Sequence, residues 1–136
     1  MLFRSKSDNP LNVMPIYVIN LSRSSERWNH MNRELLKHGV DYFERVEAVD
    51  GGALLPSETE VYYDSIENSK HYFVPLKTAE IACFLSHRRA WEMLLESEFS
   101  SACVLEDDIR FTDNPRPVLQ AISAFLQSPE PLMVKI

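Results

Sequence analysis

Three consecutive acidic residues, Glu106, Asp107 and Asp108, directly follow the apolar segment 102–105. This segment has the profile of a short buried strand. Side chains alternate along a strand, so Glu106 and Asp108 should face the same way if the strand continues. Two adjacent carboxylates repel each other, and a bound Mg²⁺ or Mn²⁺ would remove that repulsion while leaving positions for a diphosphate leaving group. The alternative is a solvated acidic turn.

A second polar group lies at the end of the apolar segment 13–21. Arg23 and Arg27 fall near the carboxyl end of this predicted strand and at the start of the next helix. Backbone N–H groups favour anions there, and arginine binds phosphate through paired hydrogen bonds. Asn20 interrupts the apolar strand, and a buried amide needs partners. The alternative for the two arginines is a solvated first helical turn.

Ser86 and His87 lie in the middle of a predicted helix. Adjacent helix positions point about 100° apart, so the two side chains are not a nucleophile and its base. His87 is either a histidine of the core or a supporting residue, or it contacts a ligand at the sheet edge. We find no motif of a zinc protease, zinc finger or serine hydrolase. Cys83 and Cys103 are expected to be buried, reduced thiols.

The composition restricts the class of protein. The 136 residues are 45% apolar with a net charge of −6, which argues against disorder and against binding to nucleic acid or anionic membranes. Three glycines are too few for a glycine-rich phosphate loop. No apolar run is long enough for a signal peptide or a membrane span, so we expect a soluble, cytoplasmic protein.

Strands and helices are predicted to alternate along the chain. The predicted strands are 13–21, 42–49, 102–105 and 132–136, and the predicted helices run from Ser22, Ser24 or Ser25 to Gly39, over 79–97 with Thr78 as cap, and from Asn114 and Pro115 to Pro129. Residues 53–75 are expected to form a long excursion with one helical turn. This α/β order predicts a mostly parallel sheet flanked by helices, with ligands bound beyond the carboxyl ends of the strands.

Four stretches within residues 14–112 occur together, in order and at similar spacing, in one known family. They are residues 15–21 with Arg23 and Arg27, residues 46–51, residues 80–87 with Ala90 and Trp91, and residues 104–108. Together they resemble glycosyltransferase family 25, the lipopolysaccharide and lipooligosaccharide biosynthesis galactosyltransferases. One departure is Ala82, where the family pattern leads us to expect glycine.

The resemblance implies a GT-A-like fold, a UDP-sugar donor, typically UDP-galactose, and transfer to a bacterial glycan with inversion. It implies Mn²⁺ or Mg²⁺ bound through Glu106 and Asp108. The residues that match the donor-binding motifs are Asn20, Arg23, Arg27, Asp50, Ser86, His87 and Asp107.

The resemblance also divides the chain. Residues 1–12 would be a flexible lead-in, and residues 13–136 the nucleotide-sugar-binding portion of a domain that continues further in the family. No general base is identifiable. The alternative is a truncated, non-catalytic remnant that binds the donor or self-associates through an exposed sheet edge. A calcium module fits poorly, because calcium takes six to eight oxygen ligands. Attachment to the inner face of the membrane is left open.

Overall fold

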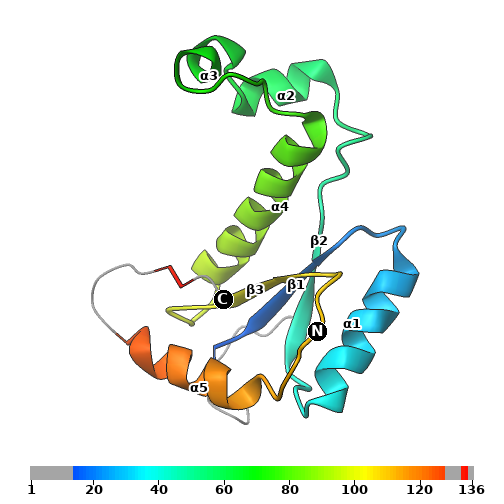
Figure 1. Cartoon of the computed structure of the whole chain (residues 1–136), viewed down its shortest axis with the longest axis vertical. Coiled ribbons are helices and arrows are strands. Elements are labelled where there is room, and N and C mark those ends of the chain that lie inside the picture. Colours follow the sequence, from blue (N-terminus) through cyan, green and yellow to red (C-terminus); the bar gives the residue numbers. More distant parts are fainter. Residues whose placement is uncertain (1–13, 128–132, 135–136) are drawn as a thin grey trace.

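The computed structural model describes residues 14–127 and 133–134. Within these residues three strands form a parallel sheet in the order β2-β1-β3, as Figure 1 shows. The strands are β1 (Ile16–Asn20), β2 (Phe43–Glu47) and β3 (Cys103–Glu106). Ile16 of the central strand pairs with Phe43 on one side and with Cys103 on the other. The predicted α/β class and parallel sheet are confirmed.

Helices cover both faces of this sheet. The helices of the described residues are α1 (Ser25–Lys37), α2 (Pro56–Tyr62), α3 (Ser65–His71), α4 (Thr78–Leu95) and α5 (Arg116–Phe125). Helices α1 and α5 pack on one face, and the carboxyl-terminal part of α4 packs on the other. Helices α2 and α3 lie at the end of α4 that is far from the sheet (Figure 1). The arrangement agrees with a GT-A-like fragment.

The central strand is buried on both faces, which explains its unbroken apolar sequence. Ile16 and Val18 belong to the cluster that includes residues of α1 and α5. Tyr17 and Ile19 belong to the cluster on the α4 side. Pro15 immediately precedes the strand, as expected, and its carbonyl accepts a hydrogen bond from the Cys103 N–H at 2.9 Å.

Gly39 ends α1, as predicted. Its φ is +68°, a backbone conformation that favours glycine after a helix. The N–H groups of Gly39 and Val40 donate to the carbonyls of Leu36 and Leu35 at 2.9 and 3.0 Å. These bonds satisfy carbonyls at the end of the helix and turn the chain toward β2.

The expectation of one helical turn in residues 53–75 was wrong, because this segment contains both α2 and α3. Pro56 stands in the first turn of α2, where its missing N–H costs little. The Asp64 carboxylate accepts hydrogen bonds from the N–H groups of Ile66 and Glu67, both at 2.9 Å, and caps α3. Neither helix has a buried residue, so the segment lacks the apolar periodicity that would have revealed it.

Two details of α4 also differ from expectation. Thr78 is the first helical residue, and the cap is Lys77, whose N–H donates to the Glu80 carboxylate at 2.7 Å. Only part of the predicted apolar face is buried. Ile81 and Leu85 are buried, whereas Phe84, Trp91 and Leu95 are 50%, 40% and 84% exposed.

Near the end of the chain, the N-cap of α5 is Pro115 rather than the expected Asn114, although the Asn114 Oδ1 accepts the Arg116 N–H at 3.1 Å. The predicted lead-in 1–12 and Pro129 lie outside the described residues, but α5 ends earlier than predicted, at Phe125. Of the predicted strand 132–136 only 133–134 are described, and these two are not in a strand. No helix among the described residues is long and apolar enough to cross a membrane.

Glu34 of α1 links this helix to the segment after β3, and it should make stability depend on pH. Its carboxylate accepts the Phe111 N–H at 2.9 Å, and this bond holds the pKa of Glu34 below 4.5. The contribution to the free energy of unfolding is complete above pH 4.5 and is lost as the pH falls toward the folded-state pKa, because the unfolded carboxylate binds its proton first. We expect the free energy of unfolding of Glu34→Gln, measured by urea titration at several pH values, to fall less on acidification than that of the wild type.

Glu60→Gln is the matched control, because Glu60 is an exposed carboxylate on α2. That variant should lose as much unfolding free energy on acidification as the wild type. An equal loss in Glu34→Gln and the wild type would contradict the role given to the Phe111 bond.

Candidate functional site

A pocket of about 340 Å³ lies beside the carboxyl ends of β1 and β3. The segment 48–52 after β2 and the amino-terminal half of α4 form its other walls. Of the predicted site residues, those that line it are Asn20, Arg23, Arg27, Asp50, Ser86, His87, Glu106 and Asp107. Open parallel sheets bind their ligands beyond the carboxyl ends of the strands, so the pocket lies at the edge where a ligand site was expected.

Asn20 is 1% exposed and has hydrogen-bond partners on both sides of its amide. Its Nδ2 donates to the Ser24 carbonyl at 3.1 Å and to Asp107 Oδ2 at 2.6 Å. Its Oδ1 accepts from Arg45 Nη2. The expected need for partners is therefore met within the protein, and Asn20 orients the Asp107 carboxylate from the central strand.

Asp107 is the buried member of the acidic triplet. Its other oxygen accepts from Arg27 Nη1 at 3.0 Å. Strand β3 ends at Glu106, so the condition for Glu106 and Asp108 to share a strand face is not met. Asp108 does not line the pocket, and its carboxylate lies 3.5 Å from Arg27 Nη2. Both Glu106 and Asp108 are more than half exposed and accessible to a ligand, and their shared role in metal binding stays a prediction.

Ser86 fixes the segment after β2 against α4. Its buried Oγ donates to the Ala82 carbonyl at 2.7 Å and accepts the Val49 N–H at 2.9 Å. Arg89 adds a second connection, since its Nη1 donates to the Glu47 carbonyl at 2.8 Å. Sequence reasoning missed Arg89, because nothing local shows that its partner is a carbonyl at the end of another strand.

Asp50 is held at the pocket by this connection and by its ion pair with Arg23. Gly51 follows it where the chain passes close to the first turn of α4. A Cβ at Gly51 would lie 3.1 Å from Ala79 Cα, which real Cβ atoms rarely approach. A larger residue here would therefore require the first turn of α4 to shift slightly, and glycine lets the two backbones pack closely.

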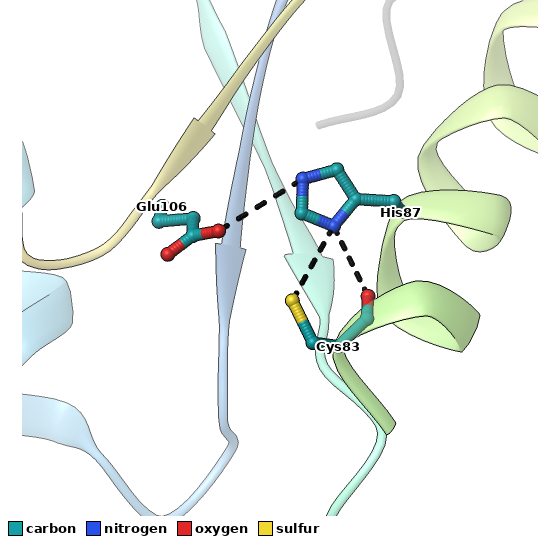
Figure 2. A group of neighbouring side chains, drawn as sticks. All are labelled: Cys83, His87 and Glu106. Carbon is teal, nitrogen blue, oxygen red and sulfur yellow. Dashed lines mark hydrogen bonds and ion pairs between the residues drawn. The ribbon is translucent and has the colours of Figure 1, made fainter. Parts of the chain in front are cut away.

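Cys83, His87 and Glu106 form a cluster on one wall of the pocket, as Figure 2 shows. One potential ligand atom from each residue lies within 4.8 Å of the other two. His87 Nδ1 lies 3.0 Å from the Cys83 carbonyl oxygen, and Nε2 lies 4.0 Å from Glu106 Oε1. His87 thus faces the site rather than the core.

The expectation that both cysteines are buried was wrong for Cys83, which is exposed. Sequence reasoning missed it as a site residue, although Cys83 and His87 are four residues apart and so share a helix face. Partial desolvation of the sulfur, and then the charge of Glu106, raise the pKa of the Cys83 thiol. Cys103 is less exposed, and burial raises its pKa to about 11.

The sequence profile of Glycosyltransferase family 25 (LPS biosynthesis protein) matches residues 13–134. Procollagen galactosyltransferase 2 of Mus musculus is 38% identical over 101 residues, which cover 71% of this chain and 16% of that protein, and the same protein of Homo sapiens gives the same values. A glycosyltransferase 25 family member of Anopheles gambiae is 39% identical over 106 residues, or 74% of this chain and 17% of that protein.

The chain thus spans about one sixth of the length of these relatives. The matched region contains the sheet, the acidic triplet and the residues that line the pocket. The profile match over most of the chain and the identity to several members show that this chain belongs to glycosyltransferase family 25.

Proposed function

We propose that this chain is the donor-binding part of a galactosyltransferase that takes galactose from UDP-galactose. The observation that carries the proposal is the convergence of four separate segments on one pocket. Residues 20–27, 48–52, 79–87 and 106–107 all contribute to its wall. Family membership supports the reaction class, and the names of the galactosyltransferase relatives support the sugar.

Two arginines are placed to bind the diphosphate of the donor. Arg23 and Arg27 follow β1 around the amino-terminal end of α1, and their side chains are 64% and 55% exposed. Each guanidinium is already paired, Arg23 with Asp50, and Arg27 with both Asp107 and Asp108. These ion pairs orient the arginines, and the N–H groups that remain free can donate to phosphate oxygens.

The charge of the pocket supports a cation as the second partner of the diphosphate. Two arginines stand against three carboxylates, those of Asp50, Glu106 and Asp107. An anionic diphosphate would therefore enter a site that is already negative. Mn²⁺ or Mg²⁺ on the exposed carboxylates of Glu106 and Asp108 would offset this negative charge, and such an ion stabilises the charge that develops on UDP as the sugar leaves.

The acceptor is a hydroxyl group, and the comparisons with known proteins suggest two classes of acceptor molecule. The family description names lipopolysaccharide biosynthesis, whereas the relatives are named for procollagen. We propose the glycan of lipopolysaccharide type, with transfer in the cytoplasm at the membrane face, where an exposed free thiol such as Cys83 persists. Transfer assays with both acceptor classes separate the two.

The proposal is tested by calorimetric titration of the chain with UDP-galactose, with and without Mn²⁺. We expect binding that requires Mn²⁺ and that weakens at least tenfold in Asp108→Asn, since one cation ligand is then neutral. UDP-glucose is the comparison ligand, and it should bind more weakly.

Asp113→Asn is the matched control, because Asp113 is exposed and lies on the same connection to α5. It should bind UDP-galactose like the wild type. Absence of UDP-galactose binding in the presence of Mn²⁺, or equal affinity in Asp108→Asn and wild type, would overturn the proposed function.

A further inference from the structure

We propose that Cys83, His87 and Glu106 form a binding site for a zinc-class divalent ion in the wall of the pocket. The three side chains come from two elements, with Cys83 and His87 on α4 and Glu106 at the end of β3 (Figure 2). The site would bridge the helix and the sheet. It goes beyond the proposed transfer, because it concerns the binding of a metal in the absence of nucleotide.

The chemistry of the three ligands determines the class of ion. A thiolate and an imidazole are soft or borderline ligands, which Zn²⁺ accepts and which Mg²⁺ rarely takes. Cysteine, histidine and a carboxylate are all regular ligands of protein-bound Zn²⁺. The set therefore differs from the pair of carboxylates proposed above, which suits Mg²⁺ or Mn²⁺.

The distances permit such an ion after a small movement of exposed side chains. Zinc–ligand lengths of about 2.0–2.3 Å place tetrahedral ligand atoms about 3.3–3.6 Å apart. His87 Nε2 and Glu106 Oε1 are 4.0 Å apart, the Cys83 sulfur lies 3.9 Å from His87 Nδ1, and one potential ligand atom of each residue lies within 4.8 Å of the other two. Glu106 is 56% exposed, so its side chain can close the remaining gap.

The backbone of α4 prepares His87 for this role. With the proton on Nδ1, the ring donates to the Cys83 carbonyl at 3.0 Å and leaves the Nε2 lone pair toward Glu106. Metal-binding histidines commonly donate their other ring N–H to a carbonyl or carboxylate in this way, which fixes the ring. The same residue thus supplies one ligand through its side chain and orients another through its carbonyl.

Three protein ligands leave a fourth position of a tetrahedral ion free. All three ligands line the pocket, so this position is open to molecules that enter it. Water would occupy it in the free protein, and an anionic oxygen could replace the water. Because Glu106 belongs to both proposed metal sites, Zn²⁺ and Mn²⁺ would compete for it.

The test is a titration of the nucleotide-free chain with Zn²⁺ in competition with a chromophoric chelator. We expect Cys83→Ser and His87→Ala each to weaken zinc binding at least tenfold, because each loses one of three ligands. Cys103→Ser is the matched control, since Cys103 lies in β3 outside the lining of the pocket, and it should retain wild-type affinity. Thermal unfolding verifies that each variant is folded.

Two further measurements identify the sulfur ligand directly. Co²⁺ in place of Zn²⁺ should produce a thiolate-to-metal charge-transfer absorption that Cys83→Ser loses. Zn²⁺, but not Mg²⁺, should also protect Cys83 from alkylation by iodoacetamide. Zinc binding that is absent, or that is as strong in Cys83→Ser and His87→Ala as in the wild type, overturns the proposal.

These outcomes are independent of the donor. A chain that binds UDP-galactose with Mn²⁺ but does not bind Zn²⁺ would refute only the zinc site. A chain that binds Zn²⁺ through Cys83 but does not bind UDP-galactose would refute only the proposed function.

Discussion

Replacement of Asn20 by alanine is expected to lower the free energy of unfolding by about 3 kcal/mol, because it leaves buried polar groups without partners. The amide donates to Asp107 at 2.6 Å and to the Ser24 carbonyl at 3.1 Å, and it accepts from Arg45. Asp107 is itself buried, and a buried carboxylate that loses a donor costs more than a neutral group. Urea unfolding of the variant and wild type measures the difference.

Asn29→Ala is the matched control for this prediction. Asn29 is an exposed asparagine on α1, and the same side-chain truncation there should change stability by less than about 0.5 kcal/mol. If the Asn20 variant loses no more stability than the Asn29 variant, the hydrogen bonds of Asn20 do not stabilise the site as we have argued.

Replacement of Leu35 by alanine is the second large effect, a loss of about 3 kcal/mol from the transferred apolar area and the cavity left behind. Leu35 is fully buried in the cluster that joins α1 to the sheet. This cluster also contains Val18 of the central strand and Leu119 of α5. The substitution would therefore weaken the packing between α1, β1 and α5.

The adjacent residue provides an internal control. Leu36 is 55% exposed, and Leu36→Ala should cost less than about 1 kcal/mol because little apolar area is lost. Denaturant midpoints for the two variants give the comparison. Equal midpoints would mean that the buried face of α1 has been assigned wrongly.

Local patterns were enough to predict much of the fold. The unbroken apolar sequence of β1 is typical of a strand buried on both faces. The glycine at position 39 predicts the end of a helix, because glycine readily adopts the positive φ found there. The capped helix α3 was missed although Asp64 is a strong cap. Its exposed sequence lacks apolar periodicity, which is the strongest indication of a helix in a sequence.

The site was harder to predict, because it depends on contacts between distant segments. The types of Arg23 and His87 suggested a site, the family resemblance added Asp50, and the parallel sheet explains why the three meet. The exposure of Cys83 was not predictable, since α4 carries apolar residues on several sides and the sequence does not show which side meets the sheet. The burial of Asp107 depends on where β3 ends, and an acidic triplet does not reveal that position.

The order of the strands also has a consequence for the synthesis of the chain. The central strand β1 leaves the ribosome first, yet one of its two neighbours, β3, comes long afterwards, and the contact between Asn20 and Asp107 spans 87 positions. Until β3 emerges, one edge of β1 has no partner within the sheet, and an open edge invites pairing with another chain. Closing so long a loop is slow relative to forming local helices. The sheet, and with it the pocket, should therefore be completed late, after α1 and α4 have formed.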